Sequence, residues 1–312
     1  MSLEKMFHLK ENNTTVKTEI MAGVTSFMTM AYILAVNPNI LAAAGMDHGA
    51  VFTATAVASF IGTLCMALFA NYPFALAPGM GLNAYFAYTV VLGMGYSWEV
   101  ALAAVLTEGI IFIILSCFNI REAIFNAIPF NLKKAVSVGI GLFITFLGLQ
   151  NAKIVIGGAT LVGLFSVDGY NKTLADGLTA SMSDAGITVL LAIFGVLITG
   201  ILIVKNVKGN ILWGILITWI LGIICQFAGI YIPNPDLGFY NLLPDFSNGI
   251  SIPSLAPIMF KFSLKGVPVL EFIVIVFAFL FVDLFDTLGT LIGVSAKADM
   301  LDADGKLPRI KG

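Results

Sequence analysis

The chain alternates long apolar runs with short polar stretches. No Asp, Glu, Lys or Arg occurs in the long blocks 20–46, 49–98, 135–152, 185–204 and 209–235. An uncharged apolar run of about 20 residues can cross a bilayer as a helix. A helix is favoured there because it pairs every backbone N–H and C=O inside the hydrocarbon. The pattern therefore predicts an all-α polytopic membrane protein.

We divide the apolar runs into eight spans, with predicted bounds 20–41, 51–70, 77–92, 97–118, 135–150, 186–204, 210–230 and 267–294. The third span is short and begins with Pro78, Gly79 and Gly81, which predicts unwound backbone followed by a half-helix. Asn37 and Pro38 are interpreted as the end of the first helix. Between spans, we expect a small hairpin in 151–185 and an ordered, proline-rich surface loop in 231–266.

Composition excludes a soluble protein and gives no sign of a metal or nucleic-acid site. Only 11% of residues are charged and the mean hydropathy is +0.98, whereas soluble domains carry about 25% charged residues. The net charge of −2 does not point to any class of partner. Cys65, Cys117 and Cys225 lie in apolar stretches without metal-ligand spacing, so we interpret them as small buried hydrophobes. We expect the lipid bilayer as surroundings, with no cofactor, no metal and no nucleic acid.

The distribution of basic residues predicts the orientation in the membrane. With a cytoplasmic N-terminus, twelve of the 16 Lys and Arg residues fall in cytoplasmic segments. Cytoplasmic loops carry such an excess, so we predict a multi-pass protein of the cell (plasma) membrane. Residues 298–312 read as a cytoplasmic loop, and we expect the natural chain to continue beyond them. The four remaining basic residues are Lys153, Lys172, Lys261 and Lys265.

Two acids lie deep in the eighth span. Asp283 is near its midpoint, and Asp286 follows three residues later, so the two carboxylates share one helix face. An acid at mid-membrane costs about 2.5–3.5 kcal/mol on insertion scales, and two adjacent carboxylates cannot both ionise cheaply. The pair is thus suited to bind a proton or to accept hydrogen bonds from a polar substrate. The alternative is that buried hydroxyls or backbone groups hold both acids in a structural role.

The start of the third span supplies a second set of candidate substrate ligands. A half-helix beginning near Gly79 and Gly81 would present free N–H groups and a positive dipole end. Asn83 lies one turn further, with a donor and an acceptor on one side chain. The alternative is a proline-kinked helix in which Asn83 bonds only to a neighbouring helix.

Three other polar residues lie within predicted spans. Thr25 and Thr29 are four residues apart on the first helix and could contact a substrate, although small hydroxyl residues usually serve helix packing in membranes. Glu108 is central in the fourth span, without an acidic neighbour in sequence. It could take part in proton coupling, or it could be protonated and bonded to another helix in a structural role.

Three segments resemble the nucleobase–cation symporter family 2, and within it the AzgA-like purine permeases. Residues 22–38 look like that branch's first helix, 77–86 like its broken third helix and 282–293 like its eighth. In the family, the Asn of the third helix and the first Asp of the eighth contact the base, and these match Asn83 and Asp283. The second Asp, matching Asp286, is tied to transport dynamics or proton coupling. The Gln-His and Glu-His pairs of the uracil and xanthine branch are absent here.

The resemblance implies a fold of fourteen spans in two inverted repeats of seven, of which this chain holds the first eight. It assigns 20–118 and 267–295 to the transport core and 134–230 to the gate, all in one membrane domain, 1–312. The family's tenth helix, with its substrate-binding Glu, is missing. The implied activity is import of a purine base (hypoxanthine, guanine or adenine) coupled to H⁺ or Na⁺, and a homodimer is compatible with it.

Two other functions are weighed against purine transport. A permease of the same fold could carry uracil, xanthine or an anion, but an anion would require a cation near the half-helix, and these spans contain no Lys or Arg. An intramembrane aspartyl protease also uses paired aspartates. Such enzymes place the two acids on separate helices, whereas Asp283 and Asp286 are three residues apart, so we expect no enzyme activity.

Overall fold

The computed structural model describes residues 6–12, 14–118, 130–157, 162–164, 181–234, 239–243, 251–298 and 300. The chain divides into two compact units. The first unit comprises Met1–Gly23, Met30–Ile144 and Ile252–Gly312, and the second comprises Val24–Thr29 and Thr145–Ser251. Each unit is therefore assembled from segments that are distant in sequence.

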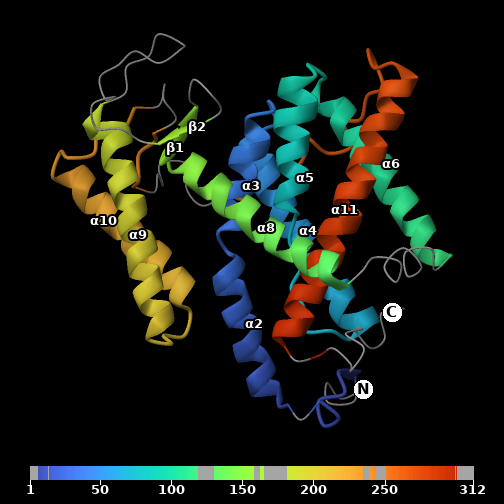
Figure 1. Cartoon of the computed structure of the whole chain (residues 1–312), viewed down its shortest axis with the longest axis horizontal. Helices are drawn as coiled ribbons and strands as arrows, with labels where there is room; N and C mark the ends of the chain where they lie inside the picture. Colours follow the sequence, from blue (N-terminus) through green and yellow to red (C-terminus); the bar gives the residue numbers. More distant parts are fainter. Residues whose placement is uncertain are drawn as a thin grey trace. The chain divides into compact units, whose positions relative to one another are not determined.

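Each of the eight predicted spans overlaps one helix or a consecutive pair of helices (Figure 1). Within the described residues, Val16–Ala42, His48–Ala70, Trp98–Cys117, Met182–Val204 and Asn210–Phe227 are long and apolar enough to cross a membrane. The chain is thus a mostly helical, multi-pass membrane protein. The helices are α2 (Val16–Met30), α3 (Ile33–Ala42), α4 (His48–Cys65), η1 (Met66–Ala70), α5 (Met80–Ala84), η2 (Tyr85–Gly93), α6 (Trp98–Cys117), α8 (Phe130–Asn151), η4 (Met182–Gly186), α9 (Ile187–Val204), α10 (Asn210–Phe227) and α11 (Val269–Lys297).

The prediction that the first helix ends at Asn37 and Pro38 is wrong. Helix α3 continues through both residues, and the helical run is interrupted earlier, at Ala31 and Tyr32. Pro38 removes one backbone donor, but membrane helices tolerate proline where neighbouring groups satisfy the freed carbonyl. The Asn37 side chain is only 4% exposed and bonds to α4 instead of marking a helix end.

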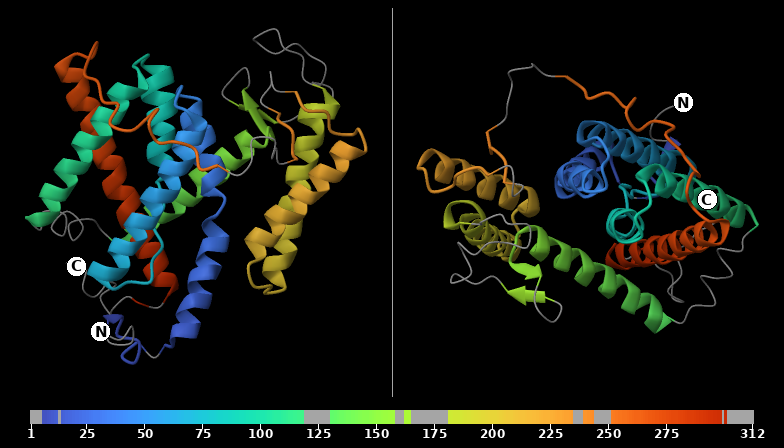
Figure 2. Two further views of the ribbon diagram at one scale, coloured as in Figure 1. Left: turned by 180° about the vertical axis from the view of Figure 1, so that it is seen from behind. Right: turned by 90° about the horizontal axis from the view of Figure 1, so that it is seen from above.

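In the first unit, helix α11 packs against α6 and contacts α5 (Figure 2). Ile275 and Phe279 of α11 and Ala101 and Ala104 of α6 are fully buried. The small alanines allow the two helices to approach closely. The ring of Phe279 meets that of Tyr85 edge-on, with centroids 4.9 Å apart. This apolar packing holds the Asp-bearing helix beside the start of the short helix α5.

Polar contacts join the ends of these helices. The Thr53 hydroxyl of α4 donates to the Pro253 carbonyl at 2.8 Å, so the proline-rich segment is ordered over its described residues, as predicted. The Tyr96 hydroxyl donates to the Glu271 carboxylate at the start of α11. The pKa of Tyr96 is raised mainly by that hydrogen bond and to a smaller degree by burial, so its hydroxyl remains a donor.

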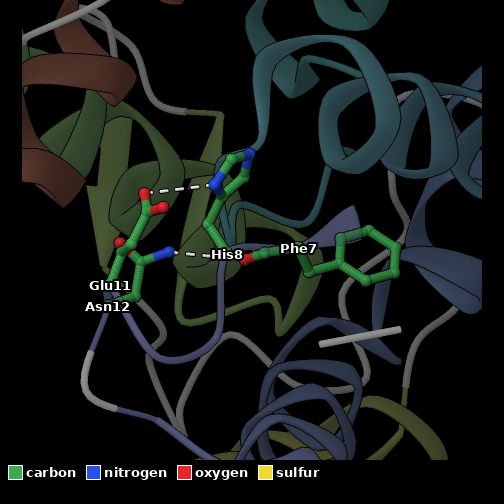
Figure 3. Close-up of polar contacts among 4 residues, drawn as sticks. All are labelled: Phe7, His8, Glu11 and Asn12. Carbon is green, nitrogen blue, oxygen red and sulfur yellow. Dashed lines mark hydrogen bonds and ion pairs between the residues drawn. The ribbon is translucent and has the colours of Figure 1, made fainter. Parts of the chain in front are cut away.

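A short turn at the N-terminus precedes α2 (Figure 3). The His8 ring nitrogen Nδ1 lies 3.1 Å from a Glu11 carboxylate oxygen, and the Asn12 amide donates to the Phe7 carbonyl at 3.5 Å. Both contacts are exposed, whereas polar side chains at membrane depth would need buried partners. This segment therefore fits a position outside the membrane.

In the second unit, two strands form the hairpin predicted in 151–185. Strands β1 (Val155–Gly157) and β2 (Val162–Leu164) pair antiparallel, with Ile156 opposite Gly163. The Lys172 of this segment lies outside the described residues, as do Lys306, Arg309 and Lys311 of the predicted C-terminal loop.

Helices α9 and α10 pack against each other through matching Gly-x-x-x-Thr sequences. A Cβ atom built on Gly195 of α9 would lie 2.5 Å from the Thr218 hydroxyl of α10, and Gly214 of α10 meets Thr199 of α9 in the same way. Each threonine hydroxyl donates to the glycine carbonyl one turn earlier in its own helix. Small residues at the crossing thus permit the close approach that is typical of membrane helices.

Candidate functional site

The backbone is unwound immediately before helix α5, as the sequence predicts. Residues 71–79 are not helical, and Gly79 is extended (φ −71°, ψ 117°) where the helix begins at Met80. The Thr63 hydroxyl of α4 accepts a hydrogen bond from the Leu76 N–H at 2.9 Å. This bond satisfies one backbone donor that has no partner within a helix of its own.

One cavity of about 510 Å³ in the first unit brings this turn together with the two aspartates. Its lining includes Pro78 and Gly79 from the turn and Asp283, Asp286 and Thr290 from α11. The two carboxylates share one helix face, as expected from their spacing. The cavity therefore combines an irregular backbone segment with two acids in a mostly apolar wall, which is typical of a small-molecule site.

Gly79 permits a close approach between the turn and α11. A Cβ atom built on Gly79 would lie 2.6 Å from Oδ2 of Asp286, closer than real Cβ contacts come. The position of the Asp286 carboxylate therefore depends on the missing side chain at Gly79. A carboxylate beside the first turn of a helix is also stabilised by the helix dipole.

We expect Gly79→Ala to displace the Asp286 carboxylate from the cavity wall. Transport should fall by about tenfold, because roughly 1.4 kcal/mol of misplaced interaction corresponds to that factor. Initial uptake rates, normalised to the amount of protein in the membrane, measure the effect. Gly109→Ala in α6 is the control, since a Cβ atom there meets nothing within 4 Å; equal loss in both variants would contradict the steric explanation.

Glu108 of α6 reaches the same acidic pair from another helix. It is only 5% exposed, and its carboxyl group interacts electrostatically with that of Asp283 on α11. Among the residues that the structure describes, its Oε1 is buried without a hydrogen-bond partner. Two carboxyl groups that interact in a site of low dielectric cannot both ionise cheaply. This pairing could not be predicted from the sequence, because Glu108 and Asp283 are far apart along the chain.

Asn83 is bonded to Asn37, which the local sequence indicates only as a helix end. Its amide nitrogen donates to the Asn37 side-chain oxygen, and Asn37 in turn donates to the Thr55 hydroxyl of α4 at 2.7 Å. Asn83 is only partly buried, whereas Asn37 and Thr55 are 4% and 2% exposed. The polar residues Asn37 and Thr55, in apolar helices, were the sequence signal that could have indicated this network.

The remaining predicted ligands are placed differently. Gly81 and Asn83 lie on α5 beside the cavity, and among the described residues neither belongs to its lining. The Thr29 hydroxyl donates to the Ser26 carbonyl at 2.8 Å within its own helix. Thr25 and Thr29 belong to the second unit, whereas the cavity belongs to the first. A substrate contact by either threonine stays a prediction.

Comparison with known proteins gives one consistent result. The profile of the Permease family, that of the xanthine/uracil permeases, matches residues 17–309. A putative permease of Methanocaldococcus jannaschii is 47% identical over 99% of this chain and 64% of its own length. The guanine/hypoxanthine permease PbuO of Bacillus subtilis is 41% identical over 98% of this chain and 65% of its own. The adenine permease AdeP of Escherichia coli is 38% identical over 99% of this chain and 62% of its own.

The chain spans just under two thirds of the length of these relatives. They are permeases and not enzymes, which excludes the aspartyl protease alternative. The resemblance that the first, third and eighth spans predicted is confirmed over nearly the whole chain. This chain belongs to the xanthine/uracil permease family and is similar to its AzgA-like members.

Proposed function

We propose that the natural protein carrying this sequence imports purine bases across the cell membrane by secondary active transport. The observation that carries the proposal is the cavity that the Gly79 turn shares with Asp283 and Asp286. Its volume lies within the roughly 300–1,000 Å³ of small-molecule sites. Relatives named as guanine/hypoxanthine and adenine permeases support the same class of substrate.

The chemistry of a purine base suits these walls. A purine offers N–H donors, which carboxylates accept, and ring nitrogens and carbonyls, which Asn83 and free backbone N–H groups can serve. Leaving one such group unpaired in a dry site would cost about 1–3 kcal/mol. In this proposal Asp283 and Asn83 contact the base, with Gly79 and Gly81 supplying backbone groups and Thr25 and Thr29 further contacts.

Proton coupling follows from the acids that surround the cavity. The carboxyl groups of Glu108 and Asp283 interact electrostatically, and Asp286 lies one turn further along the helix that carries Asp283. Two tyrosines are near these acids: Tyr32 lines the same cavity, and the ring of Tyr85 in η2 meets Phe279 of α11. A proton gained or lost at this carboxyl pair would change the charge that faces the base. We therefore favour H⁺ over Na⁺ as the coupling ion.

The proposed architecture is that of the family resemblance. Segments 20–118 and 267–295 form the transport core and 134–230 part of the gate, within two inverted repeats of seven spans. Alternating access then moves the core against the gate. The N-terminus lies in the cytoplasm, as the basic residues favour, and a homodimer is the proposed option for assembly.

Uptake in cells that lack their own purine permeases tests the proposal. Cells producing the natural protein are given labelled adenine, guanine or hypoxanthine across a pH series. We expect at least one of these bases to accumulate, and faster at lower external pH. Uptake of uracil or xanthine instead would indicate the substrate class of the other branch of the family. Absence of any uptake, with the protein present in the membrane, would refute purine transport.

A further inference from the structure

A buried chain of side-chain hydrogen bonds runs from α4 through α3 to α5. The Thr55 hydroxyl donates to the Val51 carbonyl at 2.7 Å, one turn earlier in α4. The Asn37 amide nitrogen donates to the Thr55 oxygen at 2.7 Å. The Asn83 amide nitrogen donates to the Asn37 oxygen. Three helices of the first unit are thus linked through one polar path.

The direction of this path follows from the number of protons available. A hydroxyl carries one proton, and the Val51 carbonyl takes that of Thr55. The Thr55 oxygen can then only accept, so Asn37 must present its NH₂ group to Thr55 and its carbonyl oxygen to Asn83. Asn83 must therefore donate to that oxygen through its own NH₂ group. The network thus determines which way round each side-chain amide is oriented, with its oxygen on one side and its nitrogen on the other.

We propose that Asn37 and Thr55 are positioning residues that fix the side-chain amide of Asn83, so that its carbonyl oxygen is left to accept an N–H group of the substrate. The inference rests on the proposed function. It adds that the edge of the planar heterocycle facing Asn83 is a hydrogen-bond donor, such as a ring N–H or an exocyclic amino group. The reverse polarity would present NH₂ to the substrate and select an acceptor edge.

The placement of Asn83 separates this role from simple helix packing. Asn37 and Thr55 are almost completely buried, whereas Asn83 is only partly buried. Its neighbours Met80 and Leu82 on α5 line the cavity. If the path served helix packing only, the Asn37 amide would be enough, because the Thr55 hydroxyl already bonds within its own helix. The second amide lies at the only partly buried end of the path, on the helix that borders the cavity.

Substitution of Thr55 tests the inference. Thr55→Val keeps the shape but removes the hydroxyl, so Asn37 and Asn83 lose their fixed orientation. We expect KM for the transported base to rise by about tenfold, the value of roughly one hydrogen bond, with little change in kcat. Thr55→Ser keeps the hydroxyl and should behave as the unsubstituted protein. The second readout is a panel of the same purine with each ring N–H methylated in turn.

The selectivity ratio between the purine and its methylated forms does not depend on the amount of protein. In the unsubstituted protein at least one methylated form should compete poorly, and in Thr55→Val that discrimination should shrink while Thr55→Ser keeps it. If Thr55→Val does not reach the membrane, Asn37→Leu replaces it. Leucine has a similar shape but offers no acceptor to the Asn83 NH₂ group, so discrimination should shrink, and unchanged discrimination with intact uptake would overturn the inference.

An unchanged ratio in Thr55→Val with intact uptake would overturn the inference and leave the proposed function standing. Absence of purine uptake by the unsubstituted protein would overturn the proposed function itself. The two failures are therefore distinguishable.

Discussion

Asp283→Asn should abolish accumulation of the purine base without removing the protein from the membrane. Asp283 lines the cavity and interacts electrostatically with Glu108 of α6. An amide presents one acceptor and an NH₂ group where the carboxylate presents two acceptors, so it opposes a substrate N–H and cannot exchange a proton. We expect initial uptake to fall by about 10- to 150-fold, since hydrogen bonds to charged groups are worth roughly 1.5–3 kcal/mol and each 1.4 kcal/mol is a factor of ten.

The measurement is initial uptake of labelled base, normalised to protein in isolated membranes. Glu271→Gln is the matched control, because Glu271 is an exposed acid in the first turn of the same helix, outside the cavity lining. Uptake by Asp283→Asn at the unsubstituted rate would refute the assignment of Asp283 to the substrate.

Glu108→Gln should separate coupling from binding. Glutamine keeps the length of the side chain and can still donate to Asp283, but it cannot release a proton. If Glu108 and Asp283 share the coupled proton, accumulation against a gradient and its pH dependence should be lost. Exchange of labelled base inside for unlabelled base outside should persist, because exchange needs no net proton movement.

Uptake and exchange are measured in the same vesicles at several imposed pH gradients. Glu99→Gln provides the control on α6, as Glu99 lies in the first turn of that helix, away from the acid pair. Loss of both accumulation and exchange would indicate that Glu108 serves only to pack α6 against α11. Unchanged pH dependence would exclude it from coupling.

Local patterns predicted the helices and the unwound turn because both depend on neighbouring residues. An uncharged run of sufficient length specifies a span, and Pro78 with Gly79 and Gly81 specifies interrupted helix before Met80. The same reasoning failed at Pro38, because a membrane helix can continue through a proline when the freed carbonyl finds another partner. It also missed the break at Ala31 and Tyr32, since no glycine or proline marks that position.

The pairings inside the site could not be read from sequence. Asn37 is 18 residues from Thr55 and 46 from Asn83, and Glu108 meets Asp283 from another helix. Such contacts depend on which faces of the helices pack together, and periodicity does not determine this when apolar residues cover every face. Polar residues at membrane depth indicate that partners exist, but their identity requires the structure.

If the cavity between the Gly79 turn and α11 binds the purine base, the bound base should protect a cysteine placed in the cavity wall. Thr290→Cys is introduced after Cys65, Cys117 and Cys225 are replaced, because Thr290 lines the cavity. Lys265→Cys, in the loop before α11, serves as the control. We predict that a transported purine slows alkylation of the cysteine at 290, but not at 265, in proportion to its occupancy. Equal alkylation at 290 with and without saturating base would contradict the account.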